Sequence, residues 1–161
     1  MRRLRDFDYS RKPVYITTDT FERKALFVRD SRVEKIYEAL DEVYPKYEFK
    51  VNGFVIMPTH CHFIIVSENN DLSDIMHDAK GICAFRMLDC GLVKGKLWQR
   101  GFYDHVIRNR RDLVEKLNYI HLNPLRAGLV DDPSEYRHSS YQFYYSCNDC
   151  NLPTWFERIG I

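Results

Sequence analysis

The chain has 161 residues, of which 45% are hydrophobic and 29% charged, a composition that fits one globular domain and excludes a disordered chain. A formal net charge of +1 gives no indication of a nucleic-acid partner, and no apolar stretch is long enough to span a bilayer. The charged amino terminus lacks the apolar run of a signal peptide, so we expect a cytoplasmic protein whose five cysteines are free thiols.

The hydrophobic periodicity predicts seven elements in the order strand, helix, strand, strand, helix, strand, helix. In chain order they cover residues 14–18, 31–44, 47–57, 60–66, 72–83, 102–107 and 109–123. The first six match the ferredoxin-like split βαβ arrangement, an α+β fold with helices on one face of an antiparallel sheet. Asn52-Gly53 predicts a bulge or a tight turn, and the aromatic-rich tail from Asp131 is expected to pack back on the sheet.

Capping residues and prolines set the predicted ends of the helices. Ser31 and Glu34 have the spacing of a capping box, and Pro45 closes the helix that they open. Asn109 caps the last predicted helix. Pro124 is expected to stop this helix at the preceding residue, because a residue before proline is pushed out of helical geometry.

Two histidines separated by one residue begin the third predicted strand. Positions i and i+2 of a strand point to the same face, so His60 and His62 project side by side. Two neutral imidazoles on one rigid strand can grip a metal ion. Alternatively, one histidine caps the turn after Pro58 and the other hydrogen-bonds a loop, which is the commoner outcome for an isolated H-x-H motif.

The last predicted helix carries polar side chains beside its apolar stripe. At about 100° per residue, Lys116, Tyr119 and Asn123 fall within about 60° of one another. Tyr119 and Asn123 are also neighbours at positions i and i+4. The alternative is a half-buried tyrosine that packs on the core and an asparagine that caps the helix.

Charge and cysteine spacing add weaker signals. Between Lys80 and Arg111 there are eight basic residues and two acidic ones, which indicates either a phosphate-binding face or a solvated surface. Cys147 and Cys150 have the C-x-x-C spacing of a zinc or redox pair, but no second close pair accompanies them. Two thiols in a surface loop are therefore favoured.

Three stretches in this order resemble the HUH single-tyrosine transposase family, with the REP-associated tyrosine transposases as the nearest branch. They are Met57–Val66 (MPTHCHFIIV), Leu97–Arg108 (LWQRGFYDHVIR) and Tyr119–Val130 (YIHLNPLRAGLV). The resemblance extends from about Val14 to Tyr145. It implies a ferredoxin-like fold and the cleavage and rejoining of single-stranded, hairpin-forming DNA, in a protein associated with the nucleoid.

Carried over to this chain, the resemblance assigns a role to each part of the motif. His60 and His62 would hold Mg²⁺ or Mn²⁺, with Asn123 as the third polar ligand. Tyr119 would be the nucleophile and form a 5′-phosphotyrosine intermediate. The residue between the histidines is normally a bulky hydrophobe, and here it is Cys61, a small and often buried residue whose presence we expect to be harmless. Lys116 is a candidate to favour the ionised form of the tyrosine.

The DNA would be held by basic residues on the phosphates and by aromatic rings on unpaired bases. The predicted DNA-binding residues are Lys80, Arg86, Trp98, Arg100, Arg108, Arg110, Arg111 and Lys116, with Lys94, Lys96, Phe102 and Tyr103 as further contacts. Core packing is an equal alternative for Trp98. His105 is expected to face the helix layer rather than to bind phosphate or metal.

Two other functions are compatible with these residues. A domesticated relative could bind DNA hairpins without cutting them. A zinc hydrolase built on the H-x-H motif and cysteines is the least favoured, because the sequence lacks an acidic general base placed like that of H-E-x-x-H. The oligomeric state stays open between a monomer and a homodimer.

Overall fold

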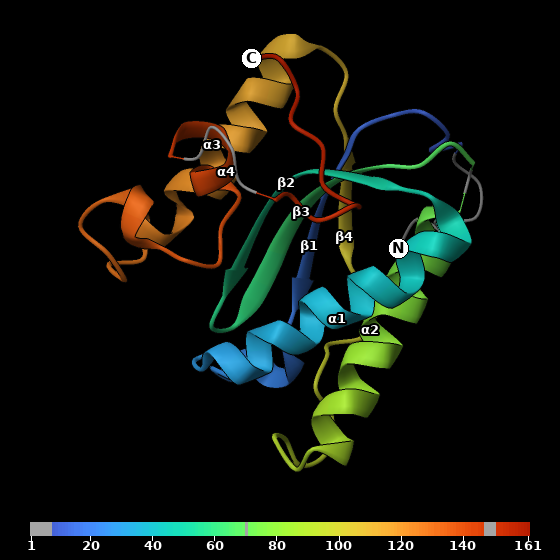
Figure 1. Ribbon diagram of the computed structural model, residues 1–161, viewed down its shortest axis with the longest axis vertical. Helices are drawn as coiled ribbons and strands as arrows, with labels where there is room; N and C mark the ends of the chain where they lie inside the picture. Colours follow the sequence, from blue (N-terminus) through green and yellow to red (C-terminus); the bar gives the residue numbers. More distant parts are fainter. Residues whose placement is uncertain (1–7, 70, 147–150) are drawn as a thin grey trace.

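Four antiparallel strands form the centre of the fold, in the spatial order β2-β3-β1-β4 (Figure 1). The computed structural model describes residues 8–69, 71–146 and 151–161. The strands are β1 (Val14–Asp19), β2 (Lys50–Met57), β3 (His60–Val66) and β4 (Tyr103–Val106). The helices are α1 (Asp30–Tyr47), α2 (Leu72–Asp89), α3 (Arg110–Arg126) and α4 (Tyr141–Tyr145), with short 3₁₀ turns η2 (Phe21–Arg23) and η3 (Pro133–Glu135). The predicted order of the main elements and the α+β class are confirmed.

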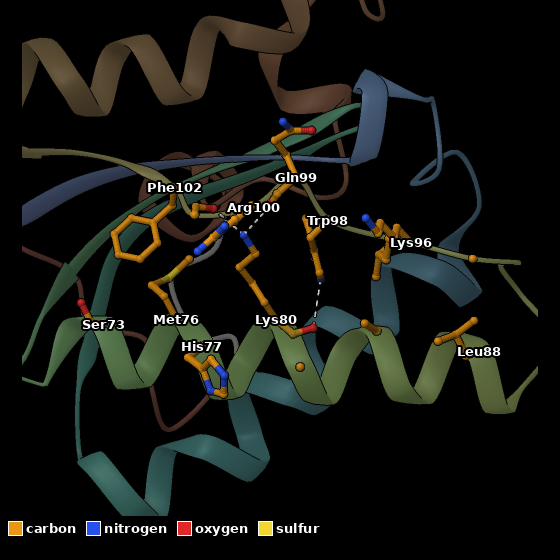
Figure 2. A pocket seen from close by; sticks show the side chains of 15 residues that line it. Ser73, Met76, His77, Lys80, Leu88, Lys96, Trp98, Gln99, Arg100 and Phe102 are labelled. Atoms are coloured by element: carbon orange, nitrogen blue, oxygen red, sulfur yellow. Dashed lines mark hydrogen bonds between the residues drawn. The ribbon is translucent and has the colours of Figure 1, made fainter. Parts of the chain in front are cut away.

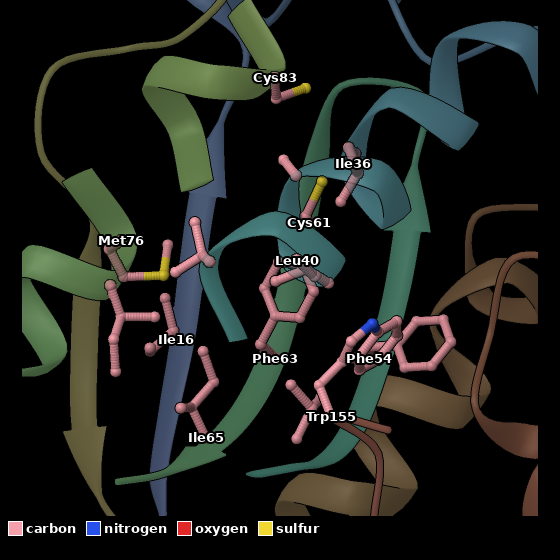
Figure 3. Packing of buried hydrophobic residues seen from close by; sticks show 14 of the residues in the cluster. Ile16, Ile36, Leu40, Phe54, Cys61, Phe63, Ile65, Met76, Cys83 and Trp155 are labelled. Carbon is pink, nitrogen blue, oxygen red and sulfur yellow. The ribbon is translucent and has the colours of Figure 1, made fainter. Parts of the chain in front are cut away.

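The two faces of the sheet are covered by different helices. Figure 1 shows α1 and α2 side by side on one face and α3 on the other. The α1/α2 face holds the larger core, where Cys61, Phe63 and Ile65 of β3 meet the two helices (Figure 3). Since strand side chains alternate, the other side chains of β3, including those of His60 and His62, point to the opposite face and toward α3. The expected one-sided helix layer is confirmed for α1 and α2, while α3 adds a second layer.

Both prolines that were expected to end helices lie inside them. Pro45 sits in the last turn of α1 and Pro124 in the last turn of α3, and each helix continues to Tyr47 and Arg126, respectively. Proline removes only one hydrogen bond, and near a helix end the remaining bonds still hold the last turn. At the other end of α1 the predicted capping box is wrong, because the helix begins at Asp30, before Ser31. The Asn109 cap is confirmed by its side chain, which accepts a hydrogen bond from the Asp112 amide at 2.9 Å.

The carboxyl-terminal segment closes the exposed edge of β2. The register of β2 against β3 shifts between Val51 and Gly53, so Asn52 is the extra residue of a β-bulge. The Asn52 amide donates to the Glu157 carbonyl at 2.9 Å, and the Tyr144 hydroxyl donates to the Asn52 carbonyl at 2.7 Å. The bulge therefore anchors the tail. The prediction that the tail packs back on the sheet is confirmed.

None of the helices in the described ranges combines the length and apolar character needed to cross a bilayer. The C-x-x-C pair Cys147–Cys150 lies outside the described residues.

Candidate active site

The face of the sheet under α3 carries the two motif histidines, at the end where β3 begins and β1 and β2 end. In the register of β3 against β1, His62 lies opposite Thr17 and His60 opposite Asp19. The two imidazole rings meet edge to face with their centroids 4.7 Å apart. Cys61 points the other way and is fully buried in the α1/α2 core, as expected for a small thiol in this position (Figure 3).

His62 is fixed on both sides of its ring. Its Nδ1 lies 2.8 Å from the Tyr15 hydroxyl and 2.9 Å from Oγ1 of Thr17. On the opposite side, the Asn123 amide nitrogen donates to Nε2 at 3.3 Å. A donor at Nε2 places the ring proton on Nδ1, where the two hydroxyls accept it. The lone pair of Nε2 therefore faces Asn123.

His60 sits at the more open end of the site. Its Nδ1 lies 2.9 Å from Oγ1 of Thr59 and 3.4 Å from the guanidinium of Arg23. Arg23 is itself paired with Asp19, the strand neighbour of His60. The His60 ring is thus bounded by the Thr59 hydroxyl and by the Asp19–Arg23 ion pair. This ion pair joins the end of β1 to the η2 turn.

Both histidines are held in the neutral form. Burial lowers the pKa of His62 to about 3, with the neighbouring His60 and Arg23 acting in the same direction. Burial and the positive charge of Arg23 also lower the pKa of His60, although Asp19 and a hydrogen bond from the His60 ring to the Asn123 side chain oppose the shift. Neutral imidazole is the form that ligates metals.

The donor set therefore fits a divalent cation with two imidazoles and one amide. No third His, Cys, Asp or Glu joins the pair among the residues that the structure describes. The third candidate ligand is Asn123, whose side chain is buried against His62. Such a set is neutral, so a bound cation would keep its full charge.

Tyr119 is presented to solvent beside the histidines. Its side chain is 41% exposed, and its ring centroid lies 5.4 Å from that of His62 and 6.3 Å from that of Tyr15. Asn123 follows one helical turn later and reaches the same histidine. The predicted neighbours His60, His62, Tyr119 and Asn123 are thus brought together from β3 and α3.

The packing of α3 on the sheet sets this geometry. Leu117 and Ile120 are buried against Val55 and Ile64 of the sheet, which leaves the adjacent side of the helix to the polar pair. A Cβ built on Gly53 would lie 2.6 Å from a Leu117 methyl, so the glycine in the bulge lets the helix approach β2 closely.

The cation over the tyrosine differs from the predicted one. The guanidinium of Arg126 lies 5.6 Å from the Tyr119 ring centroid. Lys116 instead lies 5.2 Å from the ring centroid of Tyr15. Residue 126 follows residue 119 by two helical turns and was placed outside the predicted helix, so the early helix end hid it.

Two of the predicted DNA contacts have other partners in the structure. Arg86 pairs with Glu38 and Glu42 of α1, on the face of the sheet away from the site, and its DNA-binding role stays a prediction. The Lys80 ammonium donates to the carbonyls of Gln99 and Gly101 at 3.0 and 2.5 Å (Figure 2). Through these two bonds the lysine holds the loop, and burial lowers its pKa to about 8.

Trp98 combines both of its predicted alternatives. Its indole nitrogen donates to the Lys80 carbonyl at 3.1 Å and its ring packs 5.2 Å from that of Phe27, yet it also lines the groove shown in Figure 2. Arg100 lines the same groove. The DNA-binding role of both residues stays a prediction.

The remaining predicted contacts lie around the start of α3. Arg108, Arg110 and Arg111 are exposed there, and Arg111 pairs with Glu115 at 3.1 Å. Their DNA-binding role also stays a prediction. His105 faces the helix layer, as expected, with its Nε2 2.9 Å from the Asp112 carboxylate.

The sequence reading missed four residues of the site, namely Tyr15, Thr17, Arg23 and Arg126. The first two lie on β1, more than forty positions before the histidines in the sequence. No local sequence pattern links residues that are so far apart along the chain. Alternation along β1 does place positions 15 and 17 on one face, which is the signal that was available.

Comparison with known proteins shows the family of the chain. The family model described as "Transposase IS200 like" matches residues 14–123, which include β1, both histidines, Tyr119 and Asn123. The chain belongs to the IS200-like transposase family. The match covers all four strands and most of α3, so the family assignment and the site rest on the same elements.

Individual proteins that are similar to this transposase extend the comparison. The chain is 27% identical over 113 residues to the REP-associated tyrosine transposase of Escherichia coli K12, across 69% of this chain and 66% of that protein, slightly less than two thirds of its length. A solved structure of a REP-associated tyrosine transposase bound to a REP hairpin superposes with a TM-score of 0.75 at 23% identity, covering 100% of this chain and 98% of the other. A structure from Deinococcus radiodurans matches with a TM-score of 0.51 at 17% identity, over 74% of this chain and 95% of the other. The two structures support the fold.

Proposed function

We propose that this transposase cleaves and rejoins single-stranded, hairpin-forming DNA, with Tyr119 as the nucleophile. The observation that carries the proposal is the convergence of Tyr119 and Asn123 of α3 on His62 of β3, with an Asn123–His62 distance of 3.3 Å and ring centroids 5.4 Å apart. Membership of the IS200-like family supports it, as does the hairpin bound to the structurally similar REP-associated transposase.

The reaction divides one displacement into two. The Tyr119 oxygen, having lost its proton, forms a bond to the phosphorus, the bond from phosphorus to the 3′ oxygen breaks, and that oxygen takes up a proton. The DNA is left as a 5′-phosphotyrosine and a free 3′-hydroxyl. Because the phosphodiester energy is retained in the covalent link, a 3′-hydroxyl of another strand end can displace the tyrosine without a further energy source.

His60, His62 and Asn123 would hold Mg²⁺ or Mn²⁺ in this proposal. The bound cation would neutralise charge on the scissile phosphate, which otherwise repels the nucleophile. Tyr15 and Thr17 would keep the His62 proton on Nδ1 and so direct Nε2 toward the site. Arg126 would add a fixed positive charge beside the tyrosine.

The test is incubation of the protein with end-labelled single-stranded hairpin DNA and Mn²⁺, followed by denaturing electrophoresis. We expect a protein-linked DNA band that disappears with EDTA and in Tyr119→Phe. The matched control is Tyr145→Phe, which removes a hydroxyl of similar exposure from α4 and should retain the band. Hairpin binding without any covalent band, across a broad hairpin library, would instead identify a non-cleaving hairpin-binding module.

A further inference from the structure

His121 is a buried histidine of α3 that has no part in the proposed reaction, and its side chain is 2% exposed. At about 100° per residue, His121 lies about 160° around the helix from both Tyr119 and Asn123, on the opposite edge of α3. The buried Leu117 and Ile120 lie between the two edges. Asn123 contacts His62 on one edge, so a polar contact of His121 on the other would hold the helix from both sides.

His121 has such a contact in the Ser140 hydroxyl, which is also buried. The His121 Nε2 lies 2.9 Å from Oγ of Ser140. This oxygen donates to the Phe54 carbonyl at 3.2 Å and accepts from the Phe54 amide at 2.9 Å. Because the serine proton is already used, His121 is the donor of the third bond. Nδ1 of His121 has no partner in the part of the chain that the structure describes, so the bond to Ser140 is the polar anchor of this ring.

The other end of this anchor is fixed on the sheet. Ser140 lies in a segment that runs along β2, where the preceding Ser139 forms an antiparallel bridge with Val55. Val55 is in turn the strand partner of His62. The bond from His121 therefore ties α3 to the same sheet that carries the motif histidines.

The surroundings of the His121 ring strengthen this bond. Rings of three α4 residues lie around it with centroids 5.5–5.8 Å away, namely Tyr141, Tyr144 and Tyr145. Figure 1 shows α4 beside α3. These rings keep water from the bond, and a hydrogen bond is electrostatically stronger in such a low-dielectric environment.

The two edge contacts restrict the rotation of α3 about its own axis. Apolar packing is non-directional and holds the helix against the sheet, whereas hydrogen bonds require a defined distance and angle. A rotation of about 10° moves an atom about 6 Å from the helix axis by about 1 Å. A misplacement of about 1 Å can slow a reaction by about 100-fold. The position of the Tyr119 oxygen is therefore sensitive to the contact on the opposite edge.

We propose that His121 is a positioning residue, which sets the rotation of α3 through its bond to Ser140 and so places Tyr119 for attack. The inference rests on the proposed function in taking Tyr119 as the nucleophile. It requires a hydrogen-bond donor at position 121, and not merely a side chain that fills the space.

The test compares two replacements of His121. His121→Phe keeps an aromatic ring among the tyrosines but has no donor, whereas the amide of His121→Gln can donate to Ser140. At saturating hairpin DNA and Mn²⁺, His121→Phe should form the covalent product about tenfold or more slowly in a single turnover, with nearly unchanged hairpin affinity. His121→Gln should recover most of the native rate. A native rate in His121→Phe, or a glutamine variant as slow as the phenylalanine variant, would overturn the proposal.

Ser140→Ala removes the acceptor and should slow the reaction to a similar extent. The double variant His121→Phe/Ser140→Ala should then be no slower than the slower single variant, because both changes remove the same bond. Rate losses that multiply in the double variant would show that the two residues act independently, and would contradict the proposal.

Tyr144→Phe is the control for a purely structural effect. It removes the 2.7 Å bond from the Tyr144 hydroxyl to the Asn52 carbonyl, which also joins the carboxyl-terminal segment to β2, but it removes no polar contact of α3. We expect a lower urea midpoint and a native single-turnover rate. Equal slowing in Tyr144→Phe and His121→Phe would show a general loosening of the segment and overturn the specific role of His121.

A readout without cleavage separates this inference from the proposed function. With 3-fluorotyrosine at position 119, the ¹⁹F resonance reports the surroundings of that ring in the absence of DNA. His121→Phe should shift or split the resonance, while His121→Gln and Tyr144→Phe should leave it near the native position. An unchanged resonance in His121→Phe would contradict the proposal. If the native chain never forms a covalent product but the resonance responds in this way, the cleavage proposal fails and the role of His121 in placing α3 stands.

Discussion

The hydroxyl of Tyr15 lies 2.8 Å from Nδ1 of His62, across two neighbouring strands of the sheet. The hydroxyl of Thr17 lies 2.9 Å from the same nitrogen and donates to Tyr15 at 3.3 Å. With the Asn123 amide at Nε2, this arrangement fixes both the tautomer and the orientation of the imidazole. Hydrogen bonds of this kind behind a ligating histidine typically contribute 10- to 100-fold to metal affinity, on the order of 1–3 kcal/mol.

The double variant Tyr15→Phe/Thr17→Val should therefore bind Mn²⁺ about 10- to 100-fold more weakly than the native chain. The change removes both acceptors of the Nδ1 proton and nearly preserves side-chain volume. Titration of Mn²⁺ followed by electron paramagnetic resonance gives the affinity without reference to cleavage. Tyr145→Phe is the control, and an affinity equal to the native value in the double variant would refute the assigned role.

Replacing Arg126 or Lys116 should affect the proposed nucleophile, Tyr119, to different extents. Because Arg126 lies over the Tyr119 ring and Lys116 over the Tyr15 ring, Arg126→Gln should slow formation of the covalent product about tenfold or more. Lys116→Gln should slow it less. Single-turnover rates at saturating hairpin DNA separate this effect from DNA affinity, and a larger loss in the lysine variant would restore the expectation drawn from the sequence.

Gly53 and Gly81 provide a matched pair for the packing of α3. The Cβ of Gly53→Ala would lie 2.6 Å from a Leu117 methyl, so α3 or the bulge must shift, at a cost of about 1–3 kcal/mol in the free energy of unfolding. Gly81→Ala meets nothing within 4 Å and lies inside α2, so it should stabilise the chain by about 0.4–1 kcal/mol. Urea denaturation measures both, and an unchanged midpoint for Gly53→Ala would show that the contact is easily relieved.

The buried histidines make the stability of the metal-free chain depend on pH. Burial lowers the pKa of His62 to about 3 and that of His121 to about 4. In the unfolded chain both return to about 6.5, so below this pH the unfolded state binds more protons and the free energy of unfolding falls as the pH is lowered. The loss between pH 7 and pH 5 should be about 1–2 kcal/mol for each histidine.

His121→Gln tests this dependence. The variant should lose about 1–2 kcal/mol less than the native chain over the same pH interval, whatever its stability at pH 7. His77→Gln is the control, because the His77 side chain is 86% exposed. Urea midpoints at the two pH values give the comparison, and the same pH dependence in His121→Gln and the native chain would contradict the assignment.

Local patterns were enough to predict the order of the main elements and the pairing of His60 with His62. Helix periodicity also predicted that Tyr119 and Asn123 share one side of α3. The end of that helix was wrong because Pro124 is tolerated in the last turn, and Arg126 was therefore missed. The pairing of Arg86 with Glu38 and Glu42 was not predicted, because these partners come from α1 and the contact depends on tertiary packing.

The central claim is that Tyr119 forms the covalent link to DNA, and one measurement addresses it directly. After reaction with hairpin DNA and nuclease digestion, trypsin releases the peptide Leu117–Arg126, in which Tyr119 is the single tyrosine. Mass spectrometry should find this peptide carrying a nucleotide through a phosphate on Tyr119, and should not find it in Tyr119→Phe. A nucleotide attached to any other residue, or a covalent product that persists in Tyr119→Phe, would contradict the account.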